Sequence, residues 1–559
     1  MGVSFWRLTF AAAFLLVHGF CVSEKAPYSF MKQATTAPYR STYDYIIVGG
    51  GTAGCPLAAT LSQGGASVLL LERGGSPYGN PNITKLGEFG AALWDLSPSS
   101  PSQRFISEDG VINSRARVLG GGTCLNAGFY TRAARSYVDQ VGWDPKLVNE
   151  SYGWVEEKVT FQPPMRQWQS AVRDGLLEAG ILPYNGFTYD HLSGTKIGGS
   201  IFDPNGHRHT AADLLEYADP AGITVLLHAT VHRILFATTK GGDGRKRAHG
   251  VVFKDARGRL HRAYLNRGSK NEIIVSAGAL GSPQLLLLSG LGPAAHLSSH
   301  KIRVVLNQPH VGQSMSDNPM NGIFVPSPIP VELSLIQVVG ITSFGSYIEA
   351  LSGASFDTRA DLHFTTSYPE FSQLSTSNNT VTDAPLRGGF FLEKVMGPIS
   401  TGHLELKTKS PDDNPSVTFN YFKEPEDLQR CVQGMRVVKK VVESKAFAPF
   451  KFNYLTFPML LNMTLNYPIN LKPKHQNASI SLEQFCKDTV TTIWHYHGGC
   501  QVGRVVDSDY KVLGVDSLRV IDGSTFNFSP GTNPQATLMM LGRYMGVKML
   551  TERLASDDS

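Results

Sequence analysis

Two histidines near the C-terminal end of the chain could perform acid–base chemistry. They lie in the segment Trp494-His495-Tyr496-His497-Gly498-Gly499-Cys500. A neutral imidazole near pH 7 can accept a proton from a hydroxyl group. Residues i and i+2 of a regular strand face the same side, but the paired glycines argue against a regular strand here. The spacing therefore leaves open which histidine faces a pocket, and a buried structural histidine is the alternative interpretation.

A glycine-rich turn near the N-terminal end predicts a nucleotide site. The apolar run Tyr45-Ile46-Ile47-Val48 leads into Gly49-Gly50-Gly51-Thr52-Ala53-Gly54, and a second apolar run ends at Glu72, eighteen residues after Gly54. In a βαβ unit such glycines permit a tight turn, let backbone approach a pyrophosphate, and let helix and strand pack closely. The helix N-terminus faces the phosphates, and Glu72 can accept hydrogen bonds from ribose hydroxyls. The unit predicts a dinucleotide without choosing between NAD and FAD.

Two further glycine-rich segments accompany this unit. Arg115 to Gly128 contains Gly120-Gly121-Gly122, where backbone N–H groups can face an anion or a ring edge because no Cβ intervenes. Asn126 is a polar side chain among these glycines, and a structural glycine-rich loop is the alternative. Ala277 to Gly292 has the pattern of a strand, a turn and a helix, with Pro283 near the helix start and a glycine at its end.

The elements that would position these segments are separated in the sequence. Apolar runs predict strands at 223–228, 249–253, 272–276 and 518–521, and helical periodicity covers 426–446 and 536–554. Alternating patterns at 330–350 and 385–425 predict further strands. The chain is long for a single core, so we expect two domains or one large two-part domain, with the cofactor domain assembled from distant segments.

Together these motifs resemble the glucose–methanol–choline (GMC) family of FAD-dependent oxidoreductases, over about residues 43 to 554. Within that family the chain looks most like the plant branch that contains (R)-mandelonitrile lyase and HOTHEAD-type proteins. The resemblance implies an α/β plus α+β fold, with a Rossmann-like FAD-binding domain and a substrate domain built on a large antiparallel sheet. The expected FAD-binding domain is discontinuous, at 43–150, 220–320 and 490–559, and the substrate domain comprises 151–219 and 321–489.

The resemblance also implies roles for individual residues. The 49–54 turn would hold the pyrophosphate, Glu72 the adenosine ribose, and the 117–128 segment the flavin. Asp522-Gly523 and Asn533-Pro534-Gln535 would close over the flavin. The expected FAD-binding residues are Gly49, Gly51, Thr52, Ala53, Gly54, Glu72, Arg73, Val118, Thr123, Asn126, Ala127, Gly128, Val231, Trp494, Asp522, Gly523, Pro534 and Gln535.

The family's catalytic pair is a histidine with either a second histidine or an asparagine. Family members commonly show this histidine with a glycine eight residues later, and His495 to Gly503 has that spacing. The resemblance therefore makes His495 the catalytic histidine, His497 a supporting residue, and Asn533 the partner. A neutral imidazole would take the hydroxyl proton while a hydride leaves the carbinol carbon for the flavin.

Three activities remain open at this point. The first is oxidation of a primary aryl or long-chain ω-hydroxy alcohol, as the HOTHEAD resemblance implies. The second is (R)-hydroxynitrile (mandelonitrile) lyase activity, which releases aldehyde and cyanide. Against it, Asn533 replaces the second histidine of the lyase, Ile493 replaces a tyrosine, and the substrate-contacting cysteine falls near Ile348. The third is a flavin-binding glycoprotein without catalysis.

Targeting signals and cysteines indicate an oxidising compartment. Arg7, the apolar stretch 8–20 and a small residue at Ser23 predict a cleaved signal peptide, 1–23, and a secreted or endomembrane–extracellular protein. An uncleaved membrane anchor is the alternative for this segment. Five cysteines follow Ser23; we expect a disulfide between Cys431 and Cys486, because the others lie in glycine-rich segments. Six glycosylation sequons occur, and Asn527 is expected to be unused because it is near the site: Asn82, Asn149, Asn378, Asn462, Asn477 and Asn527.

Composition and charge limit the classes of molecule that the protein could bind. A net charge of +5 over 559 residues, without a basic run, argues against nucleic acid. No segment after the signal peptide reaches eighteen consecutive apolar residues, so we expect no transmembrane span. No Cys/His spacing indicates a metal site. We expect a monomer that binds FAD and a small-molecule alcohol or cyanohydrin.

Overall fold

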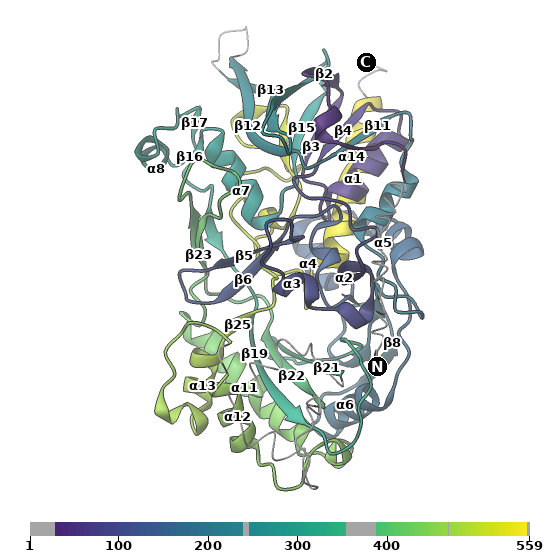
Figure 1. Ribbon diagram of the computed structural model, residues 1–559, viewed down its shortest axis with the longest axis vertical. Helices are drawn as coiled ribbons and strands as arrows, with labels where there is room; N and C mark the ends of the chain where they lie inside the picture. The colour runs from purple at the N-terminus through teal and green to yellow at the C-terminus, as the bar shows by residue number, and fades with distance from the viewer. Residues whose placement is uncertain (1–27, 239–244, 354–386, 468, 556–559) are drawn as a thin grey trace, which may run out of the picture.

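The computed structural model describes residues 28–238, 245–353, 387–467 and 469–555 (Figure 1). The predicted signal peptide and the sequon at Asn378 lie outside these residues. Two large sheets dominate the fold, one in the upper half of Figure 1 and one in the lower half. The predicted fold class, a Rossmann-like α/β part with an α+β part built on an antiparallel sheet, is confirmed.

The upper sheet has six strands, and every neighbouring pair is parallel. Its central strands are apolar and buried, as expected for a parallel sheet covered on both faces. The helices α1 (Gly54–Gln63) and α14 (Gln535–Leu554) pack against each other beside it. The order of the strands is β1 (Met31–Gln33), β11 (Ile223–Leu227), β4 (Val68–Leu71), β3 (Tyr45–Val48), β15 (Glu272–Val275) and β27 (Leu518–Val520).

The parallel arrangement brings the ends of distant segments together. Because all these strands run in one direction, their carboxyl ends lie at the same edge of the sheet. Gly49 follows β3, Glu72 follows β4, and Asp522 comes two residues after β27. Helix α7 (Gly278–Leu288) begins three residues after β15. Ligands of open α/β sheets bind at such an edge, so the fold places the predicted nucleotide segments where a ligand is expected.

The lower sheet has seven strands and is antiparallel except for the pair β8–β9. Helices α6 (Gln167–Glu178) and α11 (Pro425–Val442) pack on it, and α12 (Phe457–Leu465) and α13 (Leu482–Thr489) lie beside them. The order of the strands is β25 (Thr491–Thr492), β19 (Pro319–Pro326), β22 (Gly388–Val395), β21 (Ser346–Gly353), β20 (Val338–Ile341), β9 (Gly194–Ile197) and β8 (Tyr184–Phe187).

Smaller elements complete the described chain. A second antiparallel sheet contains β12 (Thr230–Thr238), β13 (Lys246–Lys254) and β14 (Leu260–Leu265), with β2 (Arg40–Tyr43) and β26 (Val515–Asp516) added in parallel. The remaining strands are β5 (Ser102–Ile106), β6 (Ile112–Ala116), β7 (Phe129–Tyr130), β10 (Gly199–Ser200), β16 (Leu291–Gly292), β17 (Leu306–Asn307), β18 (Gln313–Met315), β23 (Gly402–Glu405) and β24 (Ser416–Thr418). The remaining α-helices are α2 (Pro81–Thr84), α3 (Ala91–Trp94), α4 (Arg135–Val141), α5 (Pro145–Val159) and α8 (Ala294–Ser299).

Several sequence expectations can be compared with this fold. The disulfide between Cys431 and Cys486 is present and ties α11 to α13. The domain ranges stay a prediction. They leave out β1 and all of β2 except Tyr43, although both strands join the sheets. The sequon asparagines outside 354–386 are exposed, Asn527 among them, so burial does not exclude its use.

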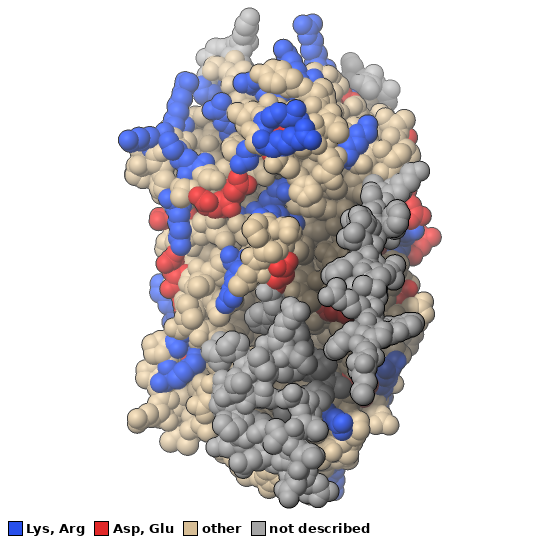
Figure 2. Space-filling model, viewed as in Figure 1, with Lys and Arg blue, Asp and Glu red and all other residues tan. Residues whose placement is uncertain are grey.

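Basic and acidic side chains are mixed on the face of the protein shown in Figure 2. Basic side chains are most frequent at the top of that view, and acidic side chains lie among them in the middle. Within the described residues, no helix has the length and apolar character needed to cross a membrane.

Candidate functional site

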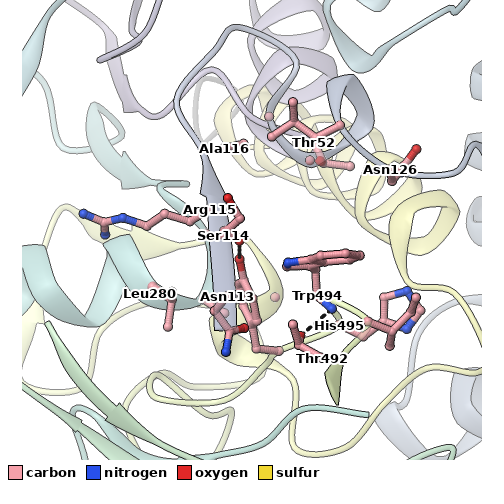
Figure 3. A pocket seen from close by; sticks show the side chains of 18 of the residues that line it. Thr52, Asn113, Ser114, Arg115, Ala116, Asn126, Leu280, Thr492, Trp494 and His495 are labelled. Atoms are coloured by element: carbon pink, nitrogen blue, oxygen red, sulfur yellow. Dashed lines mark hydrogen bonds between the residues drawn. The ribbon is translucent and has the colours of Figure 1, made fainter. Parts of the chain in front are cut away.

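A cavity of about 760 Å³ lies at the carboxyl edge of the parallel sheet. Residues of the lower sheet, among them Leu351 and Leu392, line it as well, so it lies between the two sheets. Such a volume is typical of sites for cofactors and small molecules. In Figure 3, Thr52 and Asn126 lie across the cavity from Trp494 and His495. All the sequence-predicted site residues line it except Gly54 and Thr123.

The first turn of α1 has the properties of a phosphate site. Within the described chain, the backbone N–H groups of Gly51, Thr52 and Ala53 have no acceptor, and all three residues line the cavity. A Cβ on Gly51 would come no closer than 3.8 Å to another protein atom, so packing does not demand glycine there. A side chain at Gly51 would instead fill cavity space. Free N–H groups at a helix N-terminus fit a pyrophosphate.

Gly54 serves the turn itself. A Cβ on Gly54 would lie 2.0 Å from the backbone oxygen of Gly49, which no side chain could tolerate. Gly49 has a φ of 106°, a conformation that favours glycine. These two glycines therefore set the shape of the turn, and Gly54 does so without lining the cavity.

Glu72 is buried beside this turn, and both of its carboxylate oxygens are engaged. Oε2 accepts a hydrogen bond from the Gly50 N–H at 3.0 Å, and Oε1 accepts one from the Gly74 N–H at 2.7 Å. Burial raises the pKa of Glu72 above its ordinary value, although these hydrogen bonds oppose the shift. Each oxygen retains a lone pair, so Glu72 can still accept from a ribose. Val231, at the start of β12, lines the cavity too.

Asn126 belongs to a buried polar network. Its Nδ2 donates to Gln535 Oε1 at 2.8 Å, and its Oδ1 accepts from the Gly128 N–H at 3.0 Å. The Arg208 guanidinium donates to the Asn126 backbone oxygen at 2.7 Å and to Oδ1 at 3.1 Å. Burial lowers the pKa of Arg208 to about 10. The network fixes Asn126 at the cavity, whereas Thr123 is buried and bonds Gly120 and Ala211 instead.

Asp522 joins the end of β27 to the start of α7. Its Oδ2 accepts from the Gly278 N–H at 2.8 Å and from the Ser282 hydroxyl, and its Oδ1 accepts from the Ser524 N–H at 2.8 Å. Burial raises the pKa of Asp522. A carboxylate at a helix N-terminus is favourable, and it closes this edge of the cavity.

The backbone of the histidine segment is held in an unusual conformation. Trp494 has a φ of 60°, which is rare for a bulky residue and is a form of strain that clusters at functional sites. The Trp494 N–H donates to the Thr492 hydroxyl at 2.7 Å, and the His495 N–H donates to Asp317 Oδ1 at 2.9 Å. Asp317 also accepts from the hydroxyls of Thr492 and Tyr421. Burial raises the pKa of Asp317 to about 7.

Both histidines line the cavity, so lining alone does not separate them. His497 is only 3% exposed, and its Nδ1 lies 3.0 Å from the backbone oxygen of His495, to which it donates. His495 is more exposed, and its Nδ1 lies 3.3 Å from both Asn318 Nδ2 and Tyr347 Oη. Burial, then the Lys394 charge and His497, hold the pKa of His495 well below its usual range. His495 is therefore neutral near pH 7 and can accept a proton.

Asn533 lines the same cavity with an unused acceptor. Asn533 is 9% exposed, and its Oδ1 is buried without a hydrogen-bond partner among the described residues. Two other cavity residues also carry such atoms, Asn113 at Oδ1 and Arg115 at Nη2. Buried polar atoms in proteins are nearly always paired, and these three have no partner among the described residues; the same is true of nine further atoms of residues outside the cavity.

Sequence reasoning missed the residues that support this site. Arg208, Asp317, Asn318 and Tyr347 come from loops and strands with no motif of their own. One sequence signal for two of these residues exists, the polar run Ser316-Asp317-Asn318 directly before the apolar strand β19. Ile493 lines the cavity, whereas Ile348 is fully buried and does not. Within the described residues, no group of three His, Cys, Asp or Glu could hold a metal ion.

Comparisons with known proteins agree with this arrangement. Two family models, both described as GMC oxidoreductase, match residues 43–320 and 398–542. The chain is 55% identical to Protein HOTHEAD of Arabidopsis thaliana, over 92% of this chain and 89% of that protein. It is 49% identical to an (R)-mandelonitrile lyase-like protein of the same plant, over 94% of this chain and 93% of that one. A sinalpyl alcohol oxidase of Nesocodon mauritianus is 45% identical, over 92% of this chain and 90% of that enzyme.

Solved structures share the fold at low identity. A formate oxidase superposes with a TM-score of 0.73 at 19% identity, covering 92% of this chain and 99% of its own. A fungal aryl-alcohol oxidase superposes with a TM-score of 0.68 at 18% identity, covering 92% and 100%. With the family models matching most of the chain, and with a helix N-terminus and a cavity that fit a dinucleotide, this chain belongs to the GMC oxidoreductase family, in the plant branch of HOTHEAD and mandelonitrile lyase-like proteins, and its cofactor is FAD.

Proposed function

We propose that the protein oxidises a primary alcohol to an aldehyde, with FAD as hydride acceptor and His495 as base. The observation that carries the proposal is the pair of His495 and Asn533 in one cavity, where a neutral ring and an amide side chain line the same space. A neutral imidazole supplies the base that alcohol oxidation needs. An amide can orient a hydroxyl through its donor and acceptor without exchanging a proton near neutral pH.

The proposed roles follow from the ring contacts. His495 Nδ1 is engaged with Tyr347 and Asn318, and no partner for Nε2 is found in the described part of the chain. Nε2 therefore takes the proton as the hydroxyl O–H bond breaks, and Asn533 holds the substrate oxygen. Bound FAD supplies the two-electron acceptor for the hydride that leaves the carbinol carbon. The helix α1 N-terminus would hold its pyrophosphate, and Glu72 its ribose.

The side chains near the lower sheet support an aryl or long-chain ω-hydroxy substrate. Most residues that line this part of the cavity are apolar. None of the charged lining residues comes from a strand of the lower sheet; they are Glu72, Arg73, Arg104, Arg115 and Asp522. Burial of an aromatic ring or an alkyl chain against apolar side chains is favourable in proportion to the buried area. The apolar residues are Met320, Phe324, Ile336, Leu351, Phe390, Leu392, Met463, Ile469 and Ile493.

Hydroxynitrile lyase activity is the second candidate, because His495 could also accept the hydroxyl proton of a cyanohydrin. Relatives named (R)-mandelonitrile lyase are 42–44% identical to this chain. A flavin-binding glycoprotein without catalysis is the third. Purified, flavin-loaded protein should be assayed with benzyl alcohol, an ω-hydroxy fatty acid and (R)-mandelonitrile. The proposal expects turnover of at least one alcohol. Release of cyanide without any alcohol turnover favours the lyase, and no turnover favours the third candidate.

Substitution of the two histidines tests the assignment within that assay. His495→Gln should lower alcohol turnover at least ~10²-fold, the lower range for a general acid–base residue. His497→Gln is the matched control, because its ring lies two residues away and its Nδ1 bonds backbone. A larger loss in the control than in His495→Gln would assign the base to His497 instead.

We also propose that the protein is secreted as a monomeric glycoprotein after cleavage near Ser23. The disulfide between Cys431 and Cys486 supports an oxidising compartment. The discontinuous domain division stated above remains part of this proposal. N-terminal sequencing of protein from a eukaryotic secretory host should find Met1 removed; its retention would contradict cleavage.

A further inference from the structure

Tyr347 lies directly behind the His495 ring. It is fully buried on β21, and it is not among the residues that line the cavity. Its Oη lies 3.3 Å from His495 Nδ1 and 2.8 Å from the backbone oxygen of Thr532. One hydroxyl thus links the histidine to the residue that precedes Asn533.

The Tyr347 hydroxyl can only accept a hydrogen bond from the His495 imidazole. A tyrosine has a single O–H donor, and here it is given to the Thr532 carbonyl, which can only accept. The remaining lone pairs of Oη can accept a hydrogen bond from His495. The contact therefore favours the ring that carries its proton on Nδ1.

Asn318 favours the opposite tautomer. Its Oδ1 accepts from the Gly397 N–H at 3.1 Å, which fixes the amide so that Nδ2 faces His495 Nδ1 at 3.3 Å. Nδ2 also lies 3.4 Å from the Ser529 hydroxyl oxygen. An amide N–H can only donate, so this contact favours a ring with Nδ1 unprotonated and the proton on Nε2.

The two tautomers differ in what they can do for an alcohol. With the proton on Nδ1, the lone pair of Nε2 is free to accept the hydroxyl proton. With the proton on Nε2, that nitrogen can only donate, and the base is lost. After proton transfer the imidazolium must donate from Nδ1 as well, and among the described residues only Tyr347 offers an acceptor there.

We propose that Tyr347 is a positioning residue that supplies the acceptor for the Nδ1-protonated form of His495 and accepts its hydrogen bond when Nε2 takes the substrate proton. The inference rests on the proposed function, in which His495 is the base. The ring of Tyr347 is itself held firmly, because Lys394 Nζ lies 5.3 Å from its centroid and pairs with the buried Glu349. Strand pairing places Tyr347 directly opposite Lys394.

Tyr347→Phe removes the hydroxyl and keeps the ring, so the fold and the cavity lining should persist. The rate constant of flavin reduction by a saturating alcohol should fall at least ~10-fold, since a hydrogen bond to a group that becomes charged is lost. The dependence on alcohol concentration should not change, because Tyr347 does not line the cavity. Tyr130→Phe is the matched control: Tyr130 is also fully buried, and its hydroxyl bonds Glu156 instead.

A rescue variant distinguishes two reasons for a lower rate in Tyr347→Phe. One is the lost acceptor at His495 Nδ1, and the other is a displacement of the loop that carries Asn533. In Tyr347→Phe/Asn318→Asp, a carboxylate oxygen replaces Nδ2 and can accept from His495 Nδ1, while the Thr532 carbonyl stays without its donor. Recovery of most of the lost rate supports the inference. A Tyr347→Phe rate equal to wild type overturns it, and so does a loss that a folded double variant does not recover at all. If wild type itself is not reduced by any alcohol, the proposed function has failed instead.

Discussion

Asn533→Ala should lower alcohol oxidation without lowering stability. In the described chain, Asn533 Oδ1 is buried and has no hydrogen-bond partner. Because the hydroxyl proton of the alcohol goes to His495, the Asn533 amide can hold the substrate oxygen only by donating from Nδ2, and such a hydrogen bond contributes about 1–3 kcal/mol as the oxygen gains charge. Since about 1.4 kcal/mol is tenfold in rate, the variant should lose roughly 5- to 150-fold in kcat/KM.

The free energy of unfolding of Asn533→Ala should stay close to that of the wild type. Removing an unpaired acceptor removes its desolvation cost, which offsets the packing that the smaller side chain loses. Asn321→Ala is the control, because Asn321 is fully buried, lies outside the cavity, and donates to the Cys486 carbonyl and the Thr489 hydroxyl. That control should lose about 1–3 kcal/mol of unfolding free energy and keep its kcat/KM per folded molecule.

Two measurements check this pair of variants. Steady-state rates with the best alcohol give kcat/KM, and denaturant unfolding of the flavin-loaded proteins gives the free energy of unfolding. An Asn533→Ala enzyme with unchanged kcat/KM would refute the role of the amide. A loss of stability as large as that of Asn321→Ala would show that Asn533 is a structural residue.

Three further outcomes follow from the site. Gly51→Val should purify folded but with little flavin, because a Cβ at Gly51 meets no protein atom closer than 3.8 Å and Gly51 lines the cavity. Gly153→Ala, whose Cβ meets no other atom within 4 Å, is the control; full flavin content in Gly51→Val would contradict the phosphate assignment. Arg208→Met should weaken flavin binding by freeing Asn126, measured by flavin release during dialysis; unchanged retention would contradict the network. Burial, Lys394 and His497 hold the pKa of His495 below its usual 6.5, and the ring is a base only above its pKa, so the rate of flavin reduction should stay level as pH falls through 6.5. Asp317 accepts from the His495 backbone N–H and has a pKa raised to about 7, so the profile is compared with that of Asp317→Asn. A fall centred at or above 6.5 in both proteins would contradict the lowered pKa of His495.

Local patterns in the sequence were sufficient for the nucleotide half of the site. The strand and helix around the 49–54 turn are β3 and α1, and the apolar run before Glu72 is β4. The helix expected at 536–554 is α14, which begins one residue earlier. These elements depend on neighbours in the sequence, and glycine positions carry most of their information.

The substrate half depends on contacts between distant residues. Nothing in the sequence around Tyr347 shows that its hydroxyl meets His495, 148 positions away. Arg208 reaches Asn126 from a loop 82 positions away, and Asp317 meets the backbone of His495 across 178. Such pairs arise from how two sheets meet, which periodicity does not encode. The sequence also did not predict that backbone N–H groups donate to both carboxylate oxygens of Glu72, because these contacts form only when the turn is folded.

Anaerobic mixing of the oxidised, FAD-loaded protein with candidate alcohols tests the central claim most directly. If His495 and FAD oxidise alcohols, benzyl alcohol or an ω-hydroxy fatty acid should bleach the flavin absorbance, and the His495→Gln variant should bleach at least ~10²-fold more slowly. The claim would be contradicted if no alcohol bleached the flavin while (R)-mandelonitrile was split into benzaldehyde and cyanide.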